Sequence, residues 1–229
     1  MKSSDYLLIQ KKILIEKNFL QASELLDVVD LSDIQKKELK ADILFYENDF
    51  SLASLLYNEL GDLYKEAYCY LLSGNMPKAH QILEKALPSP AQNWSLFFCQ
   101  VFTQNVTVSP SYLQIRAFLE RDLSAFLKLN LVEYVQKIID ISEYLFAINP
   151  ETNKIIARTF LYNDYPTYAK EYFNRAFEFT TEDAELYYLS GLYYLKINDL
   201  SEARSALRKA IALNDNYIPA KELLEKIKC

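Results

Sequence analysis

Residues 184–217 read AELYYLSGLYYLKINDLSEARSALRKAIALNDNY, and the spacing of small and aromatic residues in this stretch decides the fold. Tyr187, Gly191 and Tyr194 fall at i, i+4 and i+7, which places them on one face of a helix. The polar pair Asn198-Asp199 then interrupts the pattern. Beyond it, one face of a second helix is marked by Ala203, Leu207 and Ala210. The stretch therefore predicts two antiparallel helices joined by a short turn.

The same pattern occurs one period earlier, in residues 149–183. Five residues there precede five residues of similar character by a constant interval: Ala157, Phe160, Ala169, Phe173 and Ala176 precede Gly191, Tyr194, Ala203, Leu207 and Ala210. An interval of about 34 residues is typical of a helix–turn–helix repeat. One such pair cannot bury its apolar face alone, so we expect neighbouring pairs to stack against it.

The small residues have a packing role in this prediction. Gly191 and Ala203 lack bulk, so the two helices of the pair can approach closely there. We expect Tyr194 and Leu207 to fill the space beside that contact. Ala210 then leaves room for the next pair.

At these residues the chain resembles the tetratricopeptide repeat family, most clearly over residues 149–217. The family's bulky aromatic residue in the first helix is Tyr187 here, but Asn153 one repeat earlier. Its proline after the second helix is replaced by Asp215 and Thr181. The resemblance implies an all-α fold, a right-handed α-solenoid of antiparallel helix hairpins with about six to seven pairs, some of them degenerate.

Residues 1–90 are expected to form degenerate repeats of this kind. A polar residue, a bulky residue and then an alanine recur along the chain: Asn18-Phe19…Ala22, Asp49-Phe50…Ala53, Asn75-Met76…Ala79, Asp199-Leu200…Ala203 and, one residue longer, Asp164-Tyr165-Pro166…Ala169. The intervals between the first three alanines are shorter than in the C-terminal pair. The first helix, Ser3 to Glu16, is predicted to present an apolar stripe at Leu7, Leu8, Lys11 and Ile15.

Residues 91–148 form an irregular helical middle region in this prediction. Pro88-Ser89-Pro90 precedes it, and two prolines so close together break a helix. Helices are expected at 92–104, 112–129 and 131–146, with a loop at 105–110. Degenerate repeats and an irregular insert both fit this region. Residues 149–229 hold two repeats and a polar closing helix at 218–228, and we expect them to continue one array with the first half.

Composition limits the classes of function. The chain has 229 residues and a net charge of −6, so a nucleic-acid surface, which needs a basic stripe, is not expected. Residues 1–10 lack the apolar run of a secretory signal, and the richest apolar run, 94–102, is too short to span a bilayer. We therefore expect a cytoplasmic protein without membrane insertion. The three cysteines, Cys69, Cys99 and Cys229, are expected to be buried or incidental thiols.

The sequence offers no catalytic grouping. Its single histidine, His80, has no partner pattern, and Gly61, Gly74 and Gly191 are too far apart to form a phosphate loop. We expect no cofactor, no metal and no enzymatic activity.

In the resembling family, the first helix of each repeat lines a concave face that binds a partner peptide. Carried over by register, the partner-binding candidates are Lys154, Arg158, Leu161, Tyr162, Glu185, Tyr188, Leu192 and Leu195. One subgroup grips a C-terminal carboxylate with lysines, asparagines and an arginine. Lys154 matches its first lysine, but Arg158 and Leu189 stand where it needs asparagine. That ligand is therefore not predicted. Lys154 and Arg158 could hold an acidic side chain of a partner, or could form a basic edge paired with Glu151.

Three functions fit the sequence to different degrees. The first is a non-catalytic adaptor or scaffold that binds a partner peptide or helix on its concave face. The alternative is a cytoplasmic chaperone for a secreted or aggregation-prone client, which would raise the solubility of that client. The third is an enzyme with a site between Trp94 and Phe126, which would need an activity that mutations there abolish.

Overall fold

The computed structural model describes residues 4–227, and every regular element in that range is helical. The chain divides into two compact units, Met1–Ser109 and Pro110–Cys229. The boundary falls inside residues 91–148, the predicted irregular middle region. The first unit contains α1 (Ser4–Lys11), the π-helix η1 (Lys12–Glu16), α2 (Phe19–Val28), α3 (Asp33–Tyr46), α4 (Phe50–Glu59), α5 (Leu63–Leu72), α6 (Met76–Leu83) and α7 (Pro90–Thr103).

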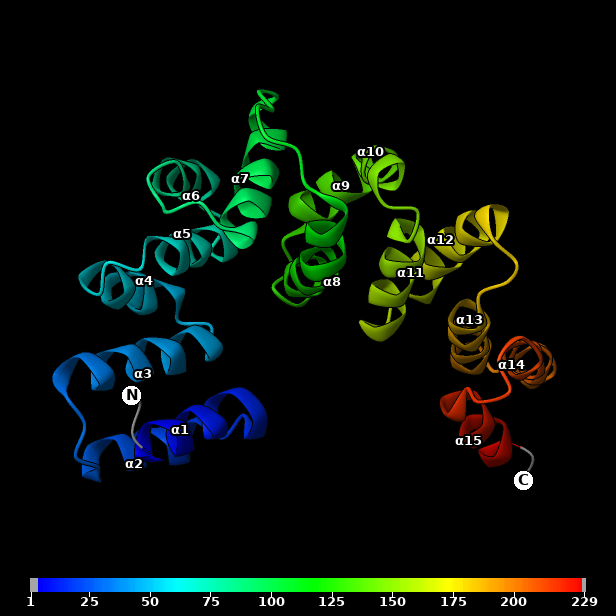
Figure 1. The fold of residues 1–229 in the computed structure, drawn as a ribbon, viewed down its shortest axis with the longest axis horizontal. Helices are drawn as coiled ribbons and strands as arrows, with labels where there is room; N and C mark the ends of the chain where they lie inside the picture. Colours follow the sequence, from blue (N-terminus) through cyan, green and yellow to red (C-terminus); the bar gives the residue numbers. More distant parts are fainter. Residues whose placement is uncertain (1–3, 228–229) are drawn as a thin grey trace. The chain divides into compact units, whose positions relative to one another are not determined.

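The second unit contains α8 (Tyr112–Lys128), α9 (Val132–Asp140), α10 (Ser142–Ile148), α11 (Thr152–Tyr162), α12 (Pro166–Phe179), α13 (Ala184–Lys196), α14 (Leu200–Leu213) and α15 (Ile218–Lys226). Successive helices pack as hairpins in both units: α1 and η1 with α2, α3 with α4, α5 with α6, α8 with α9, α11 with α12, and α13 with α14. The predicted all-α fold of helix hairpins is confirmed, as Figure 1 shows for each unit.

The turn inside each hairpin has the same two-residue conformation, a residue of positive φ followed by the N-cap residue of the second helix. In the α13–α14 turn, Asn198 has a positive φ of 61°, and Asp199 caps α14 by accepting a hydrogen bond from the Glu202 backbone N–H at 3.1 Å. The Asp199 N–H donates to the Tyr194 carbonyl at 2.8 Å and so closes the end of α13. A residue of positive φ followed by the N-cap residue recurs at Lys17-Asn18, Asn48-Asp49, Gly74-Asn75, Asn130-Leu131 and Asp164-Tyr165.

The alanine four residues after this cap is a helix-contact residue. Five such alanines are fully buried: Ala22, Ala53, Ala79, Ala169 and Ala203. In α9 the equivalent residue is Val135, which is only half buried. Val135 lines an apolar cavity of about 240 Å³ together with Ile139, Phe160 and Tyr168. The bulkier residue explains why this hairpin lacks the repeat pattern in its sequence.

A buried polar group joins three helices of the first unit. Asp42 of α3 is 8% exposed and accepts hydrogen bonds on Oδ1 from the Tyr57 hydroxyl of α4 at 2.7 Å and from Lys65 Nζ of α5 at 2.8 Å. The buried carboxylate is thus satisfied by two donors, which a core position requires. Burial, with the Asp42 charge beside it, raises the pKa of Tyr57.

We expect a Tyr57→Phe variant to lose about 1.5 kcal/mol of unfolding free energy at pH 7, the usual value of a hydrogen bond to a charged group. The raised pKa gives the sign of the pH effect. Folded Tyr57 keeps its proton when unfolded tyrosine loses it near pH 10, so its contribution is complete below pH 10 and is lost as pH rises. Urea unfolding should therefore show the two proteins converging between pH 9.5 and 11. A difference in unfolding free energy between the two proteins that stays constant across that range would contradict this assignment. The same convergence between the natural protein and a Tyr144→Phe control, which changes an exposed site, would also contradict it.

The helix predicted at 92–104 is α7, and three of its aromatic residues are buried in the first unit. Trp94, Phe97 and Phe98 are at most 1% exposed. The predicted loop follows and contains no strand. Gln100 of α7 fixes its path: the Gln100 Oε1 atom accepts from the backbone N–H groups of Thr107 at 2.8 Å and Val108 at 3.1 Å.

Two helices differ from the prediction. In the first helix the buried residues are Tyr6, Ile9 and Ile13, whereas Leu7 and Ile15 of the predicted stripe are exposed. Residues 6–9 and 13–15 are all apolar, so two different faces match helical spacing. The predicted helix 131–146 is two helices, α9 and α10, which meet at Ile141 with φ −97° and ψ 5°. Ser3 and Lys228, predicted helix ends, lie outside the described residues.

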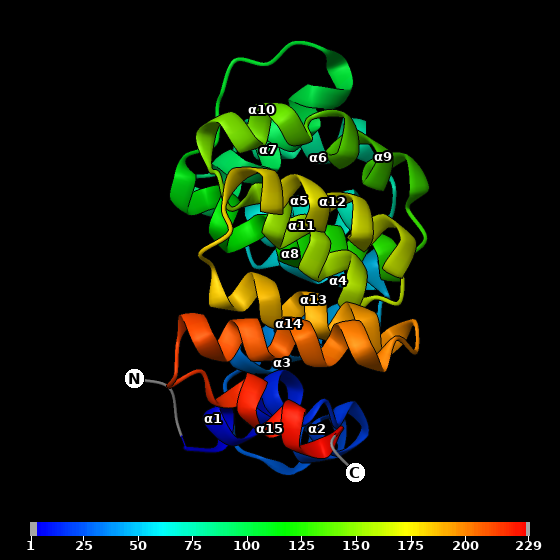
Figure 2. The same ribbon diagram turned by 90° about the vertical axis from the view of Figure 1, so that its right-hand side faces the viewer.

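In the second unit, α8, α11 and α13 form one layer, and α9, α10, α12 and α14 form the other (Figure 1). Figure 2 shows α13 and α14 side by side. A Cβ atom added to Gly191 of α13 would lie 2.9 Å from Cγ and Cδ2 of Leu207 in α14. The glycine is thus required by close helix approach.

The other repeat positions are also in the core: Ala157, Phe160, Ala169, Phe173, Ala176, Ala203, Leu207 and Ala210 are at most 5% exposed. Tyr194 differs from expectation, because it is half buried and Tyr193 is the more buried ring, at 7% exposed. Tyr193 packs against Phe173 with ring centroids 6.1 Å apart. Helix α13 carries apolar residues on most of its faces, so sequence spacing alone does not distinguish the two rings.

Cys69 and Cys99 are buried free thiols, and burial raises the pKa of each to about 12. Cys229 lies outside the described residues. Across residues 4–227, the helices are too short or too polar to cross a bilayer. Within the same range, no three His, Cys, Asp or Glu side chains are grouped to hold a metal ion.

Candidate partner-binding face of the second unit

The predicted binding residues come from two neighbouring helices of one layer. Lys154, Arg158, Leu161 and Tyr162 lie on α11, and Glu185, Tyr188, Leu192 and Leu195 lie on α13. Glu185 joins the two sets, with Oε2 lying 3.0 Å from Lys154 Nζ and Oε1 lying 2.7 Å from Arg158 Nη1. We call the surface of α8, α11, α13 and Tyr217 that surrounds these ion pairs the inner face.

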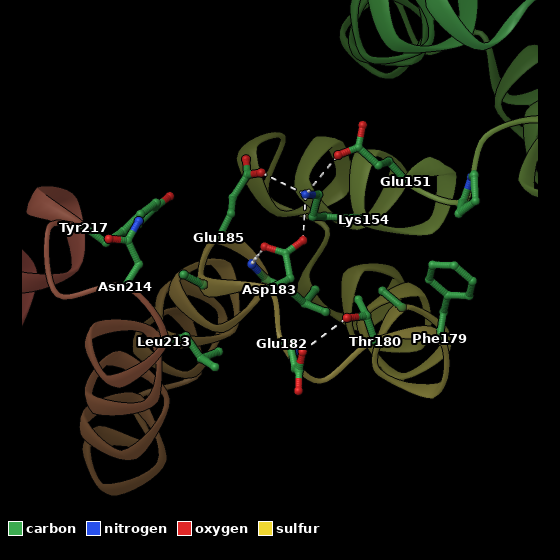
Figure 3. Close-up of a pocket in the computed structure, with 14 residues that line it drawn as sticks. Glu151, Lys154, Phe179, Thr180, Glu182, Asp183, Glu185, Leu213, Asn214 and Tyr217 are labelled. Atoms are coloured by element: carbon green, nitrogen blue, oxygen red, sulfur yellow. Dashed lines mark hydrogen bonds and ion pairs between the residues drawn. The ribbon is translucent and has the colours of Figure 1, made fainter.

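Lys154 is held by three carboxylates. Its Nζ lies 2.8 Å from Asp183, 3.0 Å from Glu185 and 3.4 Å from Glu151, as the dashed lines in Figure 3 show. The side chain is 11% exposed. Burial alone would lower the pKa of Lys154, but the hydrogen bonds to Asp183 and Glu185 outweigh it and raise the pKa. Lys154 is therefore charged and already neutralised.

Arg158 connects three helices of the inner face. Its guanidinium contacts Glu120 of α8 at 2.5 Å and 3.1 Å and Glu185 of α13 at 2.7 Å. Burial would lower the pKa of Arg158, and the two carboxylates raise it. The ion pair with Glu151 considered for Lys154 is present, but it is one part of a larger network. Lys154 can take an acidic side chain of a partner only if a carboxylate of the chain itself is displaced, whereas these contacts engage three of the five N–H groups of Arg158.

The apolar candidates have different accessibilities. Leu161 is fully buried, so it supports α11 from inside and is not available at the surface. Leu192 and Leu195 are half buried on the same helix face as Tyr188.

Three tyrosines, Tyr162, Tyr188 and Tyr217, lie near the ion pairs. Tyr162 is 54% exposed, and burial of the remainder, together with the nearby Tyr188 ring, raises its pKa. Tyr188 packs against Tyr217 with ring centroids 5.5 Å apart. Burial raises the pKa of Tyr217, and Glu185 adds to the effect. Two helices and the residue before α15 thus present an aromatic surface beside a charged one.

A cavity of about 570 Å³ opens at one end of the inner face. It lies between the start of α11, the connection at residues 180–183 and the connection at residues 214–217, and both Asp183 and Tyr217 line it (Figure 3). Glu182 lines it and forms no ion pair among residues 4–227. The cavity brings the charged and aromatic parts of the inner face to one place.

Sequence reasoning missed three residues of this face: Glu120, Asp183 and Tyr217. Asp183 could have been found, because it caps α13 by accepting from the Leu186 N–H at 3.1 Å and an N-cap aspartate precedes the first helical residue. Glu120 had no such signal, since its helix shows no repeat pattern. Tyr217 is the last residue of the repeat at residues 184–217, and in the sequence it marks only where that repeat ends.

The comparisons with known proteins agree with the hairpin at α13–α14. The family model of the tetratricopeptide repeat matches residues 184–217. Among curated proteins, none matches the chain in sequence.

Three solved structures are similar to the chain at 16% sequence identity. YrrB, described as a tetratricopeptide repeat protein with an unusual peptide-binding site, matches 91% of this chain and 98% of its own length at a TM-score of 0.37. The match to the APC/C hetero-tetramer Cut9-Hcn1 covers 93% of this chain and 46% of the other chain, with a TM-score of 0.37. The match to a tetratricopeptide repeat protein from Parabacteroides merdae covers 99% of this chain and 100% of the other, with a TM-score of 0.42. These TM-scores describe a distant likeness, so the identification of the repeat depends on the family model that matches residues 184–217. Residues 184–217, which form α13, α14 and the turn between them, are therefore a tetratricopeptide repeat.

Proposed function

We propose that the inner face of the second unit binds a segment of a partner protein, and that the chain is a non-catalytic adaptor or scaffold. The observation that carries this proposal is Tyr162, a large aromatic side chain left 54% exposed directly beside an ordered ion-pair network. Tyrosine is enriched at protein interfaces because it combines apolar area with a polar tip.

The surroundings of Tyr162 support the proposal. Arg158 and Lys154 hold α8, α11 and α13 through the contacts to Glu120 and Glu185, so the surface is formed before a partner arrives. A preformed surface loses less conformational entropy on binding than a mobile one. The half-buried Leu192 and Leu195 extend the apolar part along α13.

A photo-crosslinking residue, p-benzoylphenylalanine, placed at position 162 tests the proposal in extracts of the native source. We expect a discrete adduct whose crosslinked peptide maps to one contiguous segment of one protein. A Tyr162→Ala protein should lose at least tenfold in affinity for a synthetic copy of that segment, because removing a central interface aromatic costs about 2 kcal/mol.

Position 144 on α10 is the matched control, because Tyr144 is 44% exposed and lies in the other layer. The same crosslinker at 144 should give no such adduct. Equal adducts from positions 162 and 144, or none from 162, would contradict binding at the inner face.

A further inference from the structure

We infer that the partner segment is cationic, and that one of its Lys or Arg side chains enters the cavity at the end of the inner face. This inference rests on the proposed function and adds the chemistry of the partner. It departs from the alternative in which Lys154 and Arg158 hold an acidic side chain of the partner.

The charge balance of the inner face supports a cation. Three cations face it, Lys154, Arg158 and Arg116, the last lying 3.9 Å from Glu151. Four carboxylates lie within 4 Å of these cations, Glu120, Glu151, Asp183 and Glu185, and a fifth, Glu182, lines the cavity. Two negative charges are therefore left over where a partner would dock, and a surface favours a partner of opposite charge.

The cations Lys154 and Arg158 are largely buried, whereas the carboxylate without a cation, Glu182, is exposed. Lys154 is 11% exposed and already has three carboxylate partners. The Arg158 side chain is 23% exposed and has two. Glu182, in contrast, is exposed and lines the cavity without a cation among the described residues. At Lys154, an incoming carboxylate would have to displace Glu151, Asp183 or Glu185, whereas an incoming ammonium or guanidinium would meet Glu182 directly.

The aromatic residues beside the cavity fit the same ligand. Tyr217 lines the cavity, and Tyr162 and Tyr188 lie near it. A cation over the face of a tyrosine ring is attracted by the electron density of that ring. The cavity, at about 570 Å³, is large enough for a long side chain with part of its backbone. Carboxylates and tyrosines together thus select a Lys or Arg carried on an extended segment.

Fluorescence anisotropy with three labelled decapeptides tests the inference on the full chain. The peptides alternate serine with lysine, with glutamine or with glutamate, so they differ in charge and not in length. At 50 mM NaCl we expect the lysine peptide to bind at least tenfold more tightly than the glutamine peptide and the glutamate peptide to bind more weakly still. The preference should shrink at 300 mM NaCl, because salt screens exposed charges.

A pair of variants with equal net charge separates the cavity from the acidic chain as a whole. Glu182→Gln removes a carboxylate from the cavity, and Glu133→Gln removes one from an exposed site on α9. We expect Glu182→Gln to weaken the lysine peptide about fivefold, the effect of one nearby charge at a protein surface, and Glu133→Gln to leave it nearly unchanged. Tyr162→Ala should also weaken it.

Each outcome decides the matter. A lysine preference that Glu182→Gln and Tyr162→Ala reduce supports the inference. A lysine preference that both glutamate variants reduce equally means general attraction to an acidic chain and overturns it. Equal or tighter binding of the glutamine or glutamate peptide, reduced by Tyr162→Ala, overturns the inference and keeps the inner face as the binding surface. No binding by any peptide overturns the inference, while the crosslink at position 162 still decides the proposed function.

Discussion

A Gly191→Leu variant is expected to lose about 3 kcal/mol of unfolding free energy, the upper part of the range for overpacking a tight core. The physical reason is the close approach of α13 and α14, where even a Cβ atom would lie 2.9 Å from Leu207. Leu207 is fully buried, so it has little room to move away. The helices must separate to accept the added side chain, and the contacts around Ala203 are then lost.

Urea unfolding followed by circular dichroism measures this loss. Ser205→Leu is the matched control, because it adds the same kind of side chain at an exposed position of α14. It should change the unfolding free energy by less than about 0.5 kcal/mol, as surface substitutions usually do. A Gly191→Leu protein as stable as the control would show that the helix contact is not where the structure places it.

Replacing Lys154 by Met is expected to cost about 3 kcal/mol, because removing one partner of a buried ion pair leaves the other charges uncompensated. Three carboxylates, Glu151, Asp183 and Glu185, would then lie close together without their shared cation. Methionine keeps most of the length and apolar stem of lysine, so the loss is electrostatic in origin. Lys154→Arg retains the charge and should recover at least half of the lost stability.

The pH dependence gives a second measurement of the same contact. The pKa of Lys154 is raised in the folded protein, so its contribution is complete below the unfolded value, about 10.5, and is lost as pH rises beyond it. The difference between the natural protein and Lys154→Met should therefore be constant from pH 7 to 9 and shrink above pH 10.5. A difference that grows with pH would contradict the ion-pair assignment.

Much of the fold could be predicted because its turns are local. Asp199 and Ala203 appear in the sequence at the spacing of a cap and a helix-contact residue, and the structure uses them in those roles. The buried face of the N-terminal helix could not be predicted, since its apolar residues match helical spacing on two faces. The break at Ile141 has no proline or glycine nearby, so only tertiary packing determines it.

The candidate site could be predicted only in outline. Repeat spacing placed Lys154 and Glu185 on one face, because helical spacing depends on the sequence alone. Spacing could not show how many carboxylates converge on one cation, since Glu120 comes from a helix without repeat pattern. It also could not show that Leu161 is turned into the core, because that depends on the packing of neighbouring helices.

Hydrogen exchange of the full chain, with and without the segment crosslinked at position 162, tests the central claim most directly. If the inner face binds the segment, exchange should slow in peptides that cover Lys154–Tyr162 of α11 and Glu185–Leu195 of α13. Slowing confined to α12 and α14, or to residues 4–109, would contradict it.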